Sequence, residues 1–209
     1  AGREPWRSAL ALAWELGNDR LAQQLIGQLG PGFAPPGATS LLYQAWQKRL
    51  NTPQTSAVGR LFDAAAALSG VCLQASFEGQ GPMWLEALAS GTAEPIDLPL
   101  TEQPGGLLVT DWSPLVEYMS DSRRPRARRA AVFHASMAEV LLQQALGIRA
   151  RCAVDRVGLC GGVFQNRLLA QACAERLEAN GFEVLLAHRL PVNDAGLSFG
   201  QVMEYGSAT

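Results

Sequence analysis

The segment from residue 154 to residue 187 limits the possible fold most strongly, because it predicts a strand, a helix and a second strand in close succession. An apolar run, VDRVGLC (154–160), ends at a double glycine, and the helical pattern of 163–181 follows, closed by Gly181. FEVLLA (182–187) is the next strand. Two strands joined by a helix of this length form a parallel pair with a right-handed crossover. The chain is therefore predicted to be an α/β protein.

The double glycine, Gly161-Gly162, stands where the first of these strands passes into the helix. Glycine lets a ligand approach the backbone closely, and a helix N-terminus offers N–H groups to an anion or a nucleotide. Asn166 follows one turn into the predicted helix and has a donor and an acceptor for a ribose or a base. A tight packing turn without a ligand explains the spacing equally well, because the segment fits neither GxGxxG nor a Walker loop.

Asp194 closes PVND (191–194), between the second strand and a last helical pattern. An aspartate at such a place is usually an N-cap. Because Asp194 follows the second strand of the same unit, its carboxylate is also expected at the sheet edge that carries the Gly-Gly turn. There it would suit a divalent cation beside a phosphate, and both interpretations stay open. Gly196 and Gly200 are expected to let the last helix approach its neighbours closely.

The rest of the chain is mostly helical in pattern, apart from a Pro/Gly connector (30–37), a loop (91–106) and a strand (107–112). Helices are expected at 3–16, 19–29, 38–50, from Thr55 or Ser56 to about 72, and at 80–90, 113–119 and 126–148. Asp19 is expected to cap the second of these helices, and Thr55 or Ser56 the fourth. The pattern predicts a mainly helical subregion, 1–90, and an α/β subregion, 91–209.

Gly59 and Asp63 lie one turn apart on the fourth predicted helix. Glycine in a helix interior costs about 1 kcal/mol against alanine, so either close helix packing or a ligand has to compensate. Asp63 could hydrogen-bond a ligand that Gly59 admits. Both explanations stay open at this point.

Three further features have no assigned role. Glu78 precedes a predicted helix, where capping alone would explain it. His134 falls among alanines and leucines on a helix, where a histidine is more often a satisfied core residue than a ligand. The run Arg123–Arg129 holds five arginines. This run suits either a solvated helix start or a surface for an acidic or phosphorylated partner. Because positive charge at a helix N-terminus is unfavourable with the helix dipole, a carboxylate is expected nearby.

Composition excludes several classes of protein. A formal net charge of −2 argues against bulk nucleic-acid binding. No apolar run reaches the ~20 residues of a membrane span, and the N-terminus has no signal-peptide layout. Four cysteines without a CxxC pair, and only two histidines, argue against a zinc site built by this chain alone. Scattered cysteines suit a reducing compartment, so a cytoplasmic location is expected.

Six collinear motifs run along the chain: GRLFDAAAAL (59–68), SFEGQGPMWLEALA (76–89), VTDWSPL (109–115), FHASMAEVL (133–141), LCGGVFQNRLL (159–169) and PVNDAGLSFGQ (191–201). Together they resemble the C-terminal part of one family, the HypF carbamoyltransferases of [NiFe]-hydrogenase maturation. The resemblance covers essentially the whole chain. It implies the helix-rich second lobe of an actin-like ATPase (ASKHA) fold, with a small mixed or parallel sheet.

The resemblance also implies a reaction and its partners. Carbamoyl phosphate and ATP would give carbamoyl-adenylate, and the carbamoyl group would pass to the C-terminal cysteine of HypE, on the way to the cyanide ligands of the hydrogenase. Gly161, Gly162, Val163 and Asn166 match the family segment that holds the adenosine. Gly59 and Asp63 match the segment that meets the ribose. Asp194 matches an aspartate ligand of a divalent metal, Mg or Fe.

Some family features are missing from this sequence. Cys160 and Ala195 replace the usual Ser and Gly, and the HxxxH metal motif and the upstream domains are absent. The chain is therefore expected to be a fragment with a partial nucleotide site and an incomplete metal site, inactive alone and prone to self-association. A non-catalytic helical scaffold is the alternative function. A Rossmann-like cofactor binder is disfavoured by the lack of GxGxxG and by too few strands.

Overall fold

The computed structural model describes residues 2–30 and 33–207. The chain divides into two compact units: residues 1–88 with 116–130, and residues 89–115 with 131–209. The division of the sequence at residue 90 stays a prediction about domain organisation. Residues 31 and 32 of the expected Pro/Gly connector lie outside the described residues.

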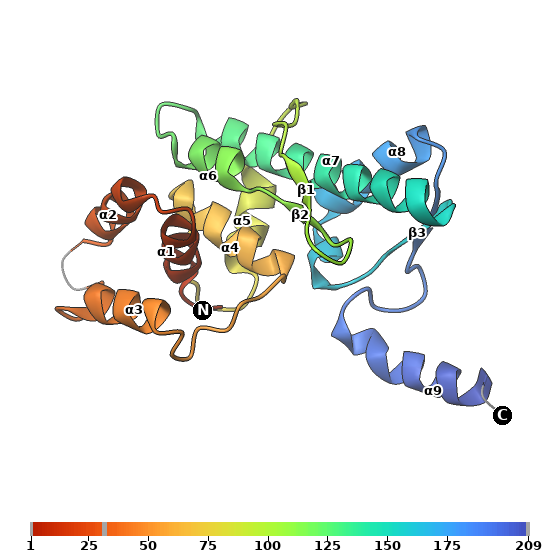
Figure 1. Cartoon of the computed structure of the whole chain (residues 1–209), viewed down its shortest axis with the longest axis horizontal. Helices are drawn as coiled ribbons and strands as arrows, with labels where there is room; N and C mark the ends of the chain where they lie inside the picture. Colours follow the sequence, from red (N-terminus) through yellow and green to blue (C-terminus); the bar gives the residue numbers. More distant parts are fainter. Residues whose placement is uncertain (1, 31–32, 208–209) are drawn as a thin grey trace. The chain divides into compact units, whose positions relative to one another are not determined.

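The first unit is built from helices (Figure 1). They are α1 (Pro5–Glu15), α2 (Asp19–Gln28), α3 (Ala38–Gln47), α4 (Val58–Leu68), α5 (Gln80–Leu88), most of α6 (Ser113–Ser120) and the start of α7 (Arg126–Cys152). α1 packs mainly against α4. Ala9 and Ala13 on α1 and the four alanines 64–67 on α4 are all buried. Such small side chains let the two helix backbones come close, and they fix the position of α4.

Two predicted helix caps in this unit are wrong, although α2 begins at Asp19 as expected. Asn18 caps α2 in place of Asp19, because its Oδ1 accepts the Leu21 N–H at 3.0 Å. α4 begins at Val58 after an N-cap, Ala57, that makes no side-chain hydrogen bond, and it ends at Leu68. Neither Thr55 nor Ser56 caps it; the Thr55 hydroxyl accepts the Ala57 N–H at 3.0 Å in the preceding turn.

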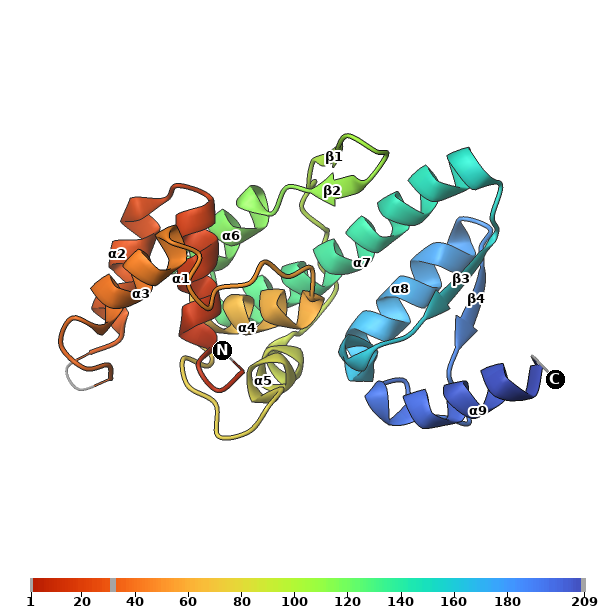
Figure 2. The same cartoon turned by 60° about the horizontal axis from the view of Figure 1, so that its bottom comes forward.

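The second unit contains the predicted strand–helix–strand segment (Figure 2). β3 (Arg156–Leu159) and β4 (Glu183–Leu186) pair in parallel, and α8 (Arg167–Ala179) connects them, so the predicted parallel pair is confirmed. α8 buries Leu169, Cys173 and Leu177. The C-terminal helix is α9 (Leu197–Ser207).

A short antiparallel hairpin, β1 (Leu100–Glu102) with β2 (Leu108–Thr110), also belongs to the second unit. The loop expected at 91–106 therefore contains a strand. α7 continues to Cys152, beyond its predicted end at 148, and Arg151 near that end donates to the Gly106 carbonyl at 2.7 Å and to Glu102 at 2.8 Å. These contacts hold the hairpin against α7. α7 is the longest helix of the described residues, and none of these helices is long and apolar enough to cross a bilayer.

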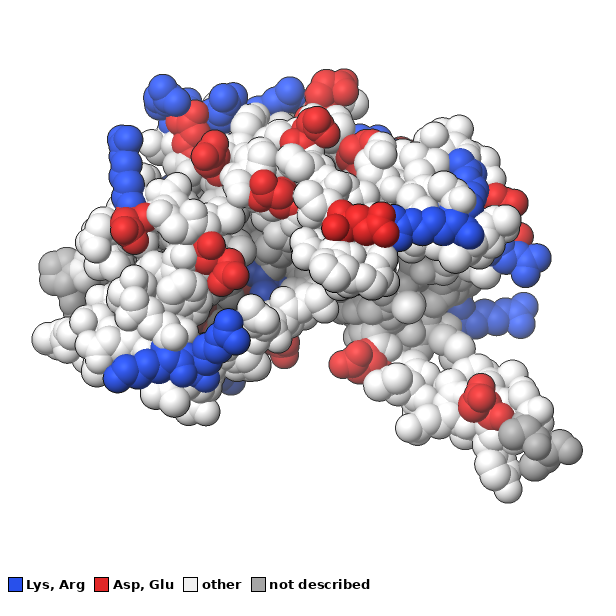
Figure 3. Space-filling model, viewed as in Figure 1, with Lys and Arg blue, Asp and Glu red and all other residues white. Residues whose placement is uncertain are grey.

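Acidic and basic side chains are interspersed on the face shown in Figure 3.

Arg123 and Arg124 at the start of the arginine run both contact Asp121, at 2.8 and 3.1 Å. The Arg123 hydrogen bond lowers the pKa of Asp121 to about 2. The carboxylate expected near this run is therefore supplied by the chain itself.

Candidate functional site

The turn after β3 has the geometry that its double glycine suggests. Gly161 has φ +105° and ψ 157°, a conformation that side chains disfavour, and Gly162 opens a 3₁₀ turn (Gly162–Gln165). A Cβ placed on either glycine would meet no atom within 4 Å. The backbone conformation at residue 161 accounts for the presence of a glycine there. Close packing does not account for the glycine at either position. The turn therefore leaves room for a ligand beside Gly162.

A backbone hydrogen bond joins this turn to the loop that leads to Asp194. The Gly161 N–H donates to the Val192 carbonyl at 2.7 Å. The structure thus brings together the Gly-Gly turn and the segment 191–194, as expected for residues that follow neighbouring parallel strands. The same bond occupies one of the N–H groups that were expected to face a ligand.

Asn166 differs most from its predicted setting. It does not lie one turn inside a helix; it is the N-cap of α8, between the 3₁₀ turn and the helix. Its Oδ1 accepts the Leu169 N–H at 2.8 Å, and its Nδ2 lies 2.9 Å from Nε2 of His134. Both functional ends of the amide thus have partners within the protein. A contact between Asn166 and a nucleoside stays a prediction.

Asp194 is not the helix cap that its position suggested. Asn193 is the cap, because its Oδ1 accepts the Ala195 N–H at 3.2 Å, and Asp194 opens a 3₁₀ turn (Asp194–Gly196) with an exposed side chain. Gly196 is packed closely, since a Cβ there would lie 2.8 Å from the Pro191 carbonyl oxygen, whereas Gly200 faces open space. The Asp194 carboxylate is therefore not used for capping.

The residues present do not make a metal centre by themselves. Within residues 2–30 and 33–207, no three His, Cys, Asp or Glu side chains gather where they could hold a metal ion. Asp194 could supply one oxygen ligand, and a stable divalent site needs several more.

The other predicted site residues, Gly59 and Asp63, lie in the first unit on α4. Asp63 is buried, and its Oδ2 lies 2.7 Å from the Arg60 Nη1. This ion pair lacks hydrogen-bond geometry, so among the described residues no donor is aligned with that oxygen. Burial raises the pKa of Asp63 above its ordinary value of 3.8, and the Arg60 charge offsets this only in part. The Asp63 carboxylate is therefore buried, and Arg60 supplies the positive charge next to it.

Gly59 is the second residue of α4, not a mid-helix glycine, so its cost to the helix is smaller than expected. A Cβ at Gly59 would meet no atom within 4 Å, which removes close packing as its explanation. Close packing is found instead at Gly81 of α5, where a Cβ would lie 3.1 Å from the Cβ of Ala66 and 3.9 Å from Oδ1 of Asp63. Gly81 thus lets α5 close over the Asp63 carboxylate.

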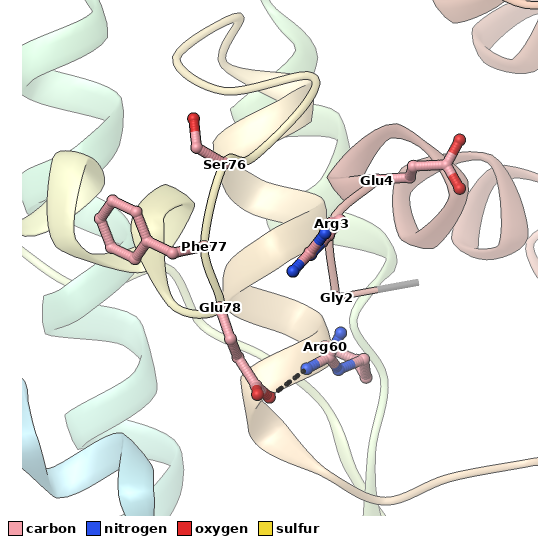
Figure 4. A pocket seen from close by; sticks show the side chains of 7 residues that line it. All are labelled: Gly2, Arg3, Glu4, Arg60, Ser76, Phe77 and Glu78. Atoms are coloured by element: carbon pink, nitrogen blue, oxygen red, sulfur yellow. Dashed lines mark ion pairs between the residues drawn. The ribbon is translucent and has the colours of Figure 1, made fainter.

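A pocket of about 620 Å³ opens beside Arg60 (Figure 4). It is lined by Gly2, Arg3, Glu4, Arg60, Ser76, Phe77 and Glu78. Arg60 extends toward Glu78, with 3.6 Å between Nη2 and the carboxylate, while Phe77 and Glu4 point away on opposite sides. Sequence reasoning left Glu78 without a role and did not single out Arg60. The sequence signal available for Arg60 was Asp63, an acidic residue one turn later on the same helix.

Replacing Asp63 by asparagine is expected to change how stability depends on pH. A carboxyl whose folded pKa is raised stabilises the fold below its ordinary pKa, and this contribution is lost as the pH rises through the folded value. The variant lacks this titration, so its free energy of unfolding relative to the parent should increase as the pH rises from the ordinary carboxyl pKa of 3.8. Urea unfolding at a series of pH values measures this difference. A difference that is constant with pH, or that falls, would contradict the assignment.

Comparison with known proteins identifies the family. Residues 1–201 match the family model described as "Carbamoyltransferase, Kae1-like Domain, second subdomain". The chain belongs to the HypF family of carbamoyltransferases. It is 36% identical over 201 residues to the carbamoyltransferase HypF of Rhodobacter capsulatus, and 37% identical over 206 residues to that of Rhizobium leguminosarum bv. viciae. In both comparisons the match covers 96% of this chain and 25% of the relative, so the chain spans about a quarter of the length of these HypF proteins.

Solved HypF structures share the fold. A crystal structure described as full-length HypF in the phosphate- and nucleotide-bound form superposes with a TM-score of 0.87 and 29% identity. The match covers 96% of this chain and 26% of the HypF chain. The expected helix-rich α/β fold, with a small sheet, is therefore confirmed.

Proposed function

We propose that the chain acts within a HypF-type carbamoyltransferase and supplies part of its nucleotide site. The observation that carries the proposal is the open Gly161-Gly162 turn after β3, in a chain whose residues 1–201 match the family domain. The solved HypF with the same fold is described as binding nucleotide. Glycine backbone without side chains in the way suits the close approach of a nucleoside and its phosphates. Val163, next in the turn, would contribute backbone to the same surface.

Asp63 and Gly59 are proposed to meet the ribose. Asp63 is buried and paired with Arg60 at 2.7 Å, so a ribose hydroxyl would reach its carboxylate after that pair opens. Gly59 leaves open space one turn before it. A charge-assisted hydrogen bond of this kind is stronger than a neutral one, so it would contribute both affinity and orientation.

The proposed reaction needs no nucleophile from this chain. Carbamoyl phosphate would lose inorganic phosphate, and the carbamate would react with ATP to give carbamoyl-adenylate and pyrophosphate. The C-terminal cysteine thiolate of HypE would then attack the carbamoyl carbon, forming an S-carbamoyl group with AMP as the leaving group. The part played by these residues is orientation of the adenylate and stabilisation of developing charge. Asp194 is proposed to be one ligand of a divalent metal whose other ligands would come from outside this chain.

Calorimetric titration of ATP with Mg²⁺ into the purified chain tests the proposal. Weak binding is expected, because only part of the site is present. Carbamoyl transfer to a peptide with the HypE C-terminus should be absent from the isolated chain and present when the remaining part of a HypF relative is added. Absence of ATP binding both alone and with that remaining part would overturn the proposal, and transfer by the chain alone would overturn its partial character.

Replacing Gly59 by alanine should separate binding from stability. The methyl group meets no atom in the fold, and the change should leave the free energy of unfolding equal or raise it by up to about 0.5 kcal/mol. ATP affinity should fall severalfold, because the methyl group occupies space proposed for the ribose. Calorimetry and urea unfolding of the same sample measure both. Equal affinity in the variant would remove Gly59 from the proposed site.

The alternative, a helical interaction domain, is supported by one surface. Five large apolar residues of α9 each have at least two fifths of their surface exposed: Leu197, Phe199, Val202, Met203 and Tyr205. An apolar face of this kind usually contacts another protein. If the chain binds no ATP in any context but associates through α9, the interaction-domain function would be favoured.

Self-association through α9 is expected for the purified chain. Val202 is 68% exposed, so replacing it by lysine should weaken association without disturbing a core. Leu41 of α3 has similar exposure, at 66%, and Leu41→Lys is the matched control, with association unchanged. Analytical ultracentrifugation over a concentration series measures both. A monomer at every concentration would contradict this expectation.

A further inference from the structure

The amide of Asn166 can take only one orientation. The Leu169 N–H, which points at the Asn166 side chain from the first turn of α8, requires an acceptor, and Oδ1 provides it at 2.8 Å. The opposite orientation would place two donors against each other. Nδ2 therefore faces His134, whose Nε2 lies 2.9 Å away. Asn166 is 8% exposed and His134 is 1% exposed, so this pair is shielded from water.

The orientation of Asn166 fixes the chemical state of His134. Nδ2 is a donor, so Nε2 of the imidazole has to accept and carries no hydrogen. The ring is therefore neutral, with its hydrogen on Nδ1. A histidine that merely filled space on α7 would have no such requirement.

This contact anchors one end of the Gly-Gly turn. The turn begins at Gly161, whose N–H is held by the Val192 carbonyl at 2.7 Å, and it ends at Asn166, held by His134. Asn166 also donates its own N–H to the Val163 carbonyl at 3.1 Å and accepts the Ala170 N–H at 3.0 Å. The position of the whole turn therefore depends on where α7 places the imidazole.

We infer that His134 is a positioning residue for the nucleotide turn, acting as the Nδ1–H tautomer through Asn166. The expected effect on ATP binding rests on the proposed function, whereas the contact between His134 and Asn166 does not. Loss of the acceptor would leave the Nδ2 group buried without a partner, which is costly, so the cap and the turn would shift together. His134→Leu should therefore weaken ATP binding about tenfold. His134→Gln, which can offer an oxygen to the same Nδ2, should restore most of the affinity.

Nitrogen NMR of the full chain, labelled with ¹⁵N-histidine, tests the contact without any ligand. The sequence has two histidines, and His188→Gln identifies the exposed one. The His134 ring should show an unprotonated Nε2 and a protonated Nδ1. In Asn166→Asp the cap oxygen is kept but the donor becomes an acceptor, so Nε2 should gain a hydrogen. A protonated Nε2 in the parent chain, or a ring that Asn166→Asp leaves unchanged, would overturn the inference.

Amide hydrogen exchange and ATP titration of the same variants separate this inference from the proposed function. Exchange over residues 163–170 should accelerate in His134→Leu and stay close to that of the parent in His134→Gln. If the parent chain binds no ATP while exchange and tautomer follow these expectations, the proposed function fails for this chain and the positioning role stands. If ATP binds with equal affinity to the parent and to His134→Leu, and exchange is unchanged, the positioning role is overturned.

Discussion

Replacing Arg129 by methionine is expected to lower the free energy of unfolding by about 3 kcal/mol. Arg129 is 4% exposed, and its guanidinium donates to the carbonyls of Leu68, Ser69 and Met119. These carbonyls end α4 and α6, where the helix dipoles favour a positive charge. Desolvation lowers the pKa of Arg129. Among the described residues, the acceptors of its hydrogen bonds are carbonyl oxygens and not carboxylates. Methionine fills the space but leaves all three carbonyls buried without this donor.

The matched control is Arg123→Met in the same arginine run. The Arg123 side chain is 88% exposed, and its contact with Asp121 is a surface ion pair. Such pairs contribute between zero and about 1 kcal/mol, so this variant should unfold close to the parent midpoint in urea. Arg129→Lys should lie between the two, because one ammonium group cannot reach all three carbonyls. Equal unfolding midpoints for Arg129→Met and Arg123→Met would contradict this account of Arg129.

Replacing Gly162 by valine is expected to weaken ATP binding about tenfold or more while the fold keeps its stability. Gly162 has no positive φ, and a Cβ there meets no atom within 4 Å, so a side chain can begin at this position without backbone strain or a clash at Cβ. A nucleotide on the turn would meet it directly. Gly161 is a poor choice for this test, because its φ of +105° would strain any other residue and confuse binding with folding.

Gly200→Val provides the control for this prediction. Gly200 also has open space around it and lies in the same unit, but it belongs to α9. ATP affinity should be unchanged in this variant, and the free energy of unfolding of both variants should stay within about 0.5 kcal/mol of the parent. Calorimetry gives the affinities. An unchanged affinity in Gly162→Val would mean that the open space at the turn is not the nucleotide site.

The strand–helix–strand segment could be predicted because its signals are local. The apolar run of β3, the glycines and the periodicity of α8 lie within about thirty consecutive residues, and right-handed connection rules supply the rest. Helix caps were less predictable. Asn18 and Asn193, each one residue before an aspartate, hold the caps that were assigned to Asp19 and Asp194. Neighbouring Asn and Asp have nearly equal cap preference, so sequence alone does not decide between them.

Contacts between distant residues could not be predicted. Arg129 meets carbonyls about sixty residues away in the sequence, and His134 meets Asn166 across thirty-two. Spacing on one helix gives no sign of either pairing. The same limit applies to the glycines of the candidate site. Gly59 and Gly81 look alike in sequence, but only the packed structure shows that Gly81 touches Ala66 while Gly59 faces open space.

The most direct test of the central claim is a ¹H–¹⁵N spectrum of the chain, titrated with ATP and Mg²⁺ and assigned residue by residue. The account predicts that the amide signals of Gly161, Gly162 and Val163 shift as ATP is added, and that those of Gly59 to Asp63 also shift. Gly162→Val should abolish the shifts in the turn. ATP-dependent shifts confined to α9 or α3, with both glycine segments unchanged, would contradict the assignment of the nucleotide site.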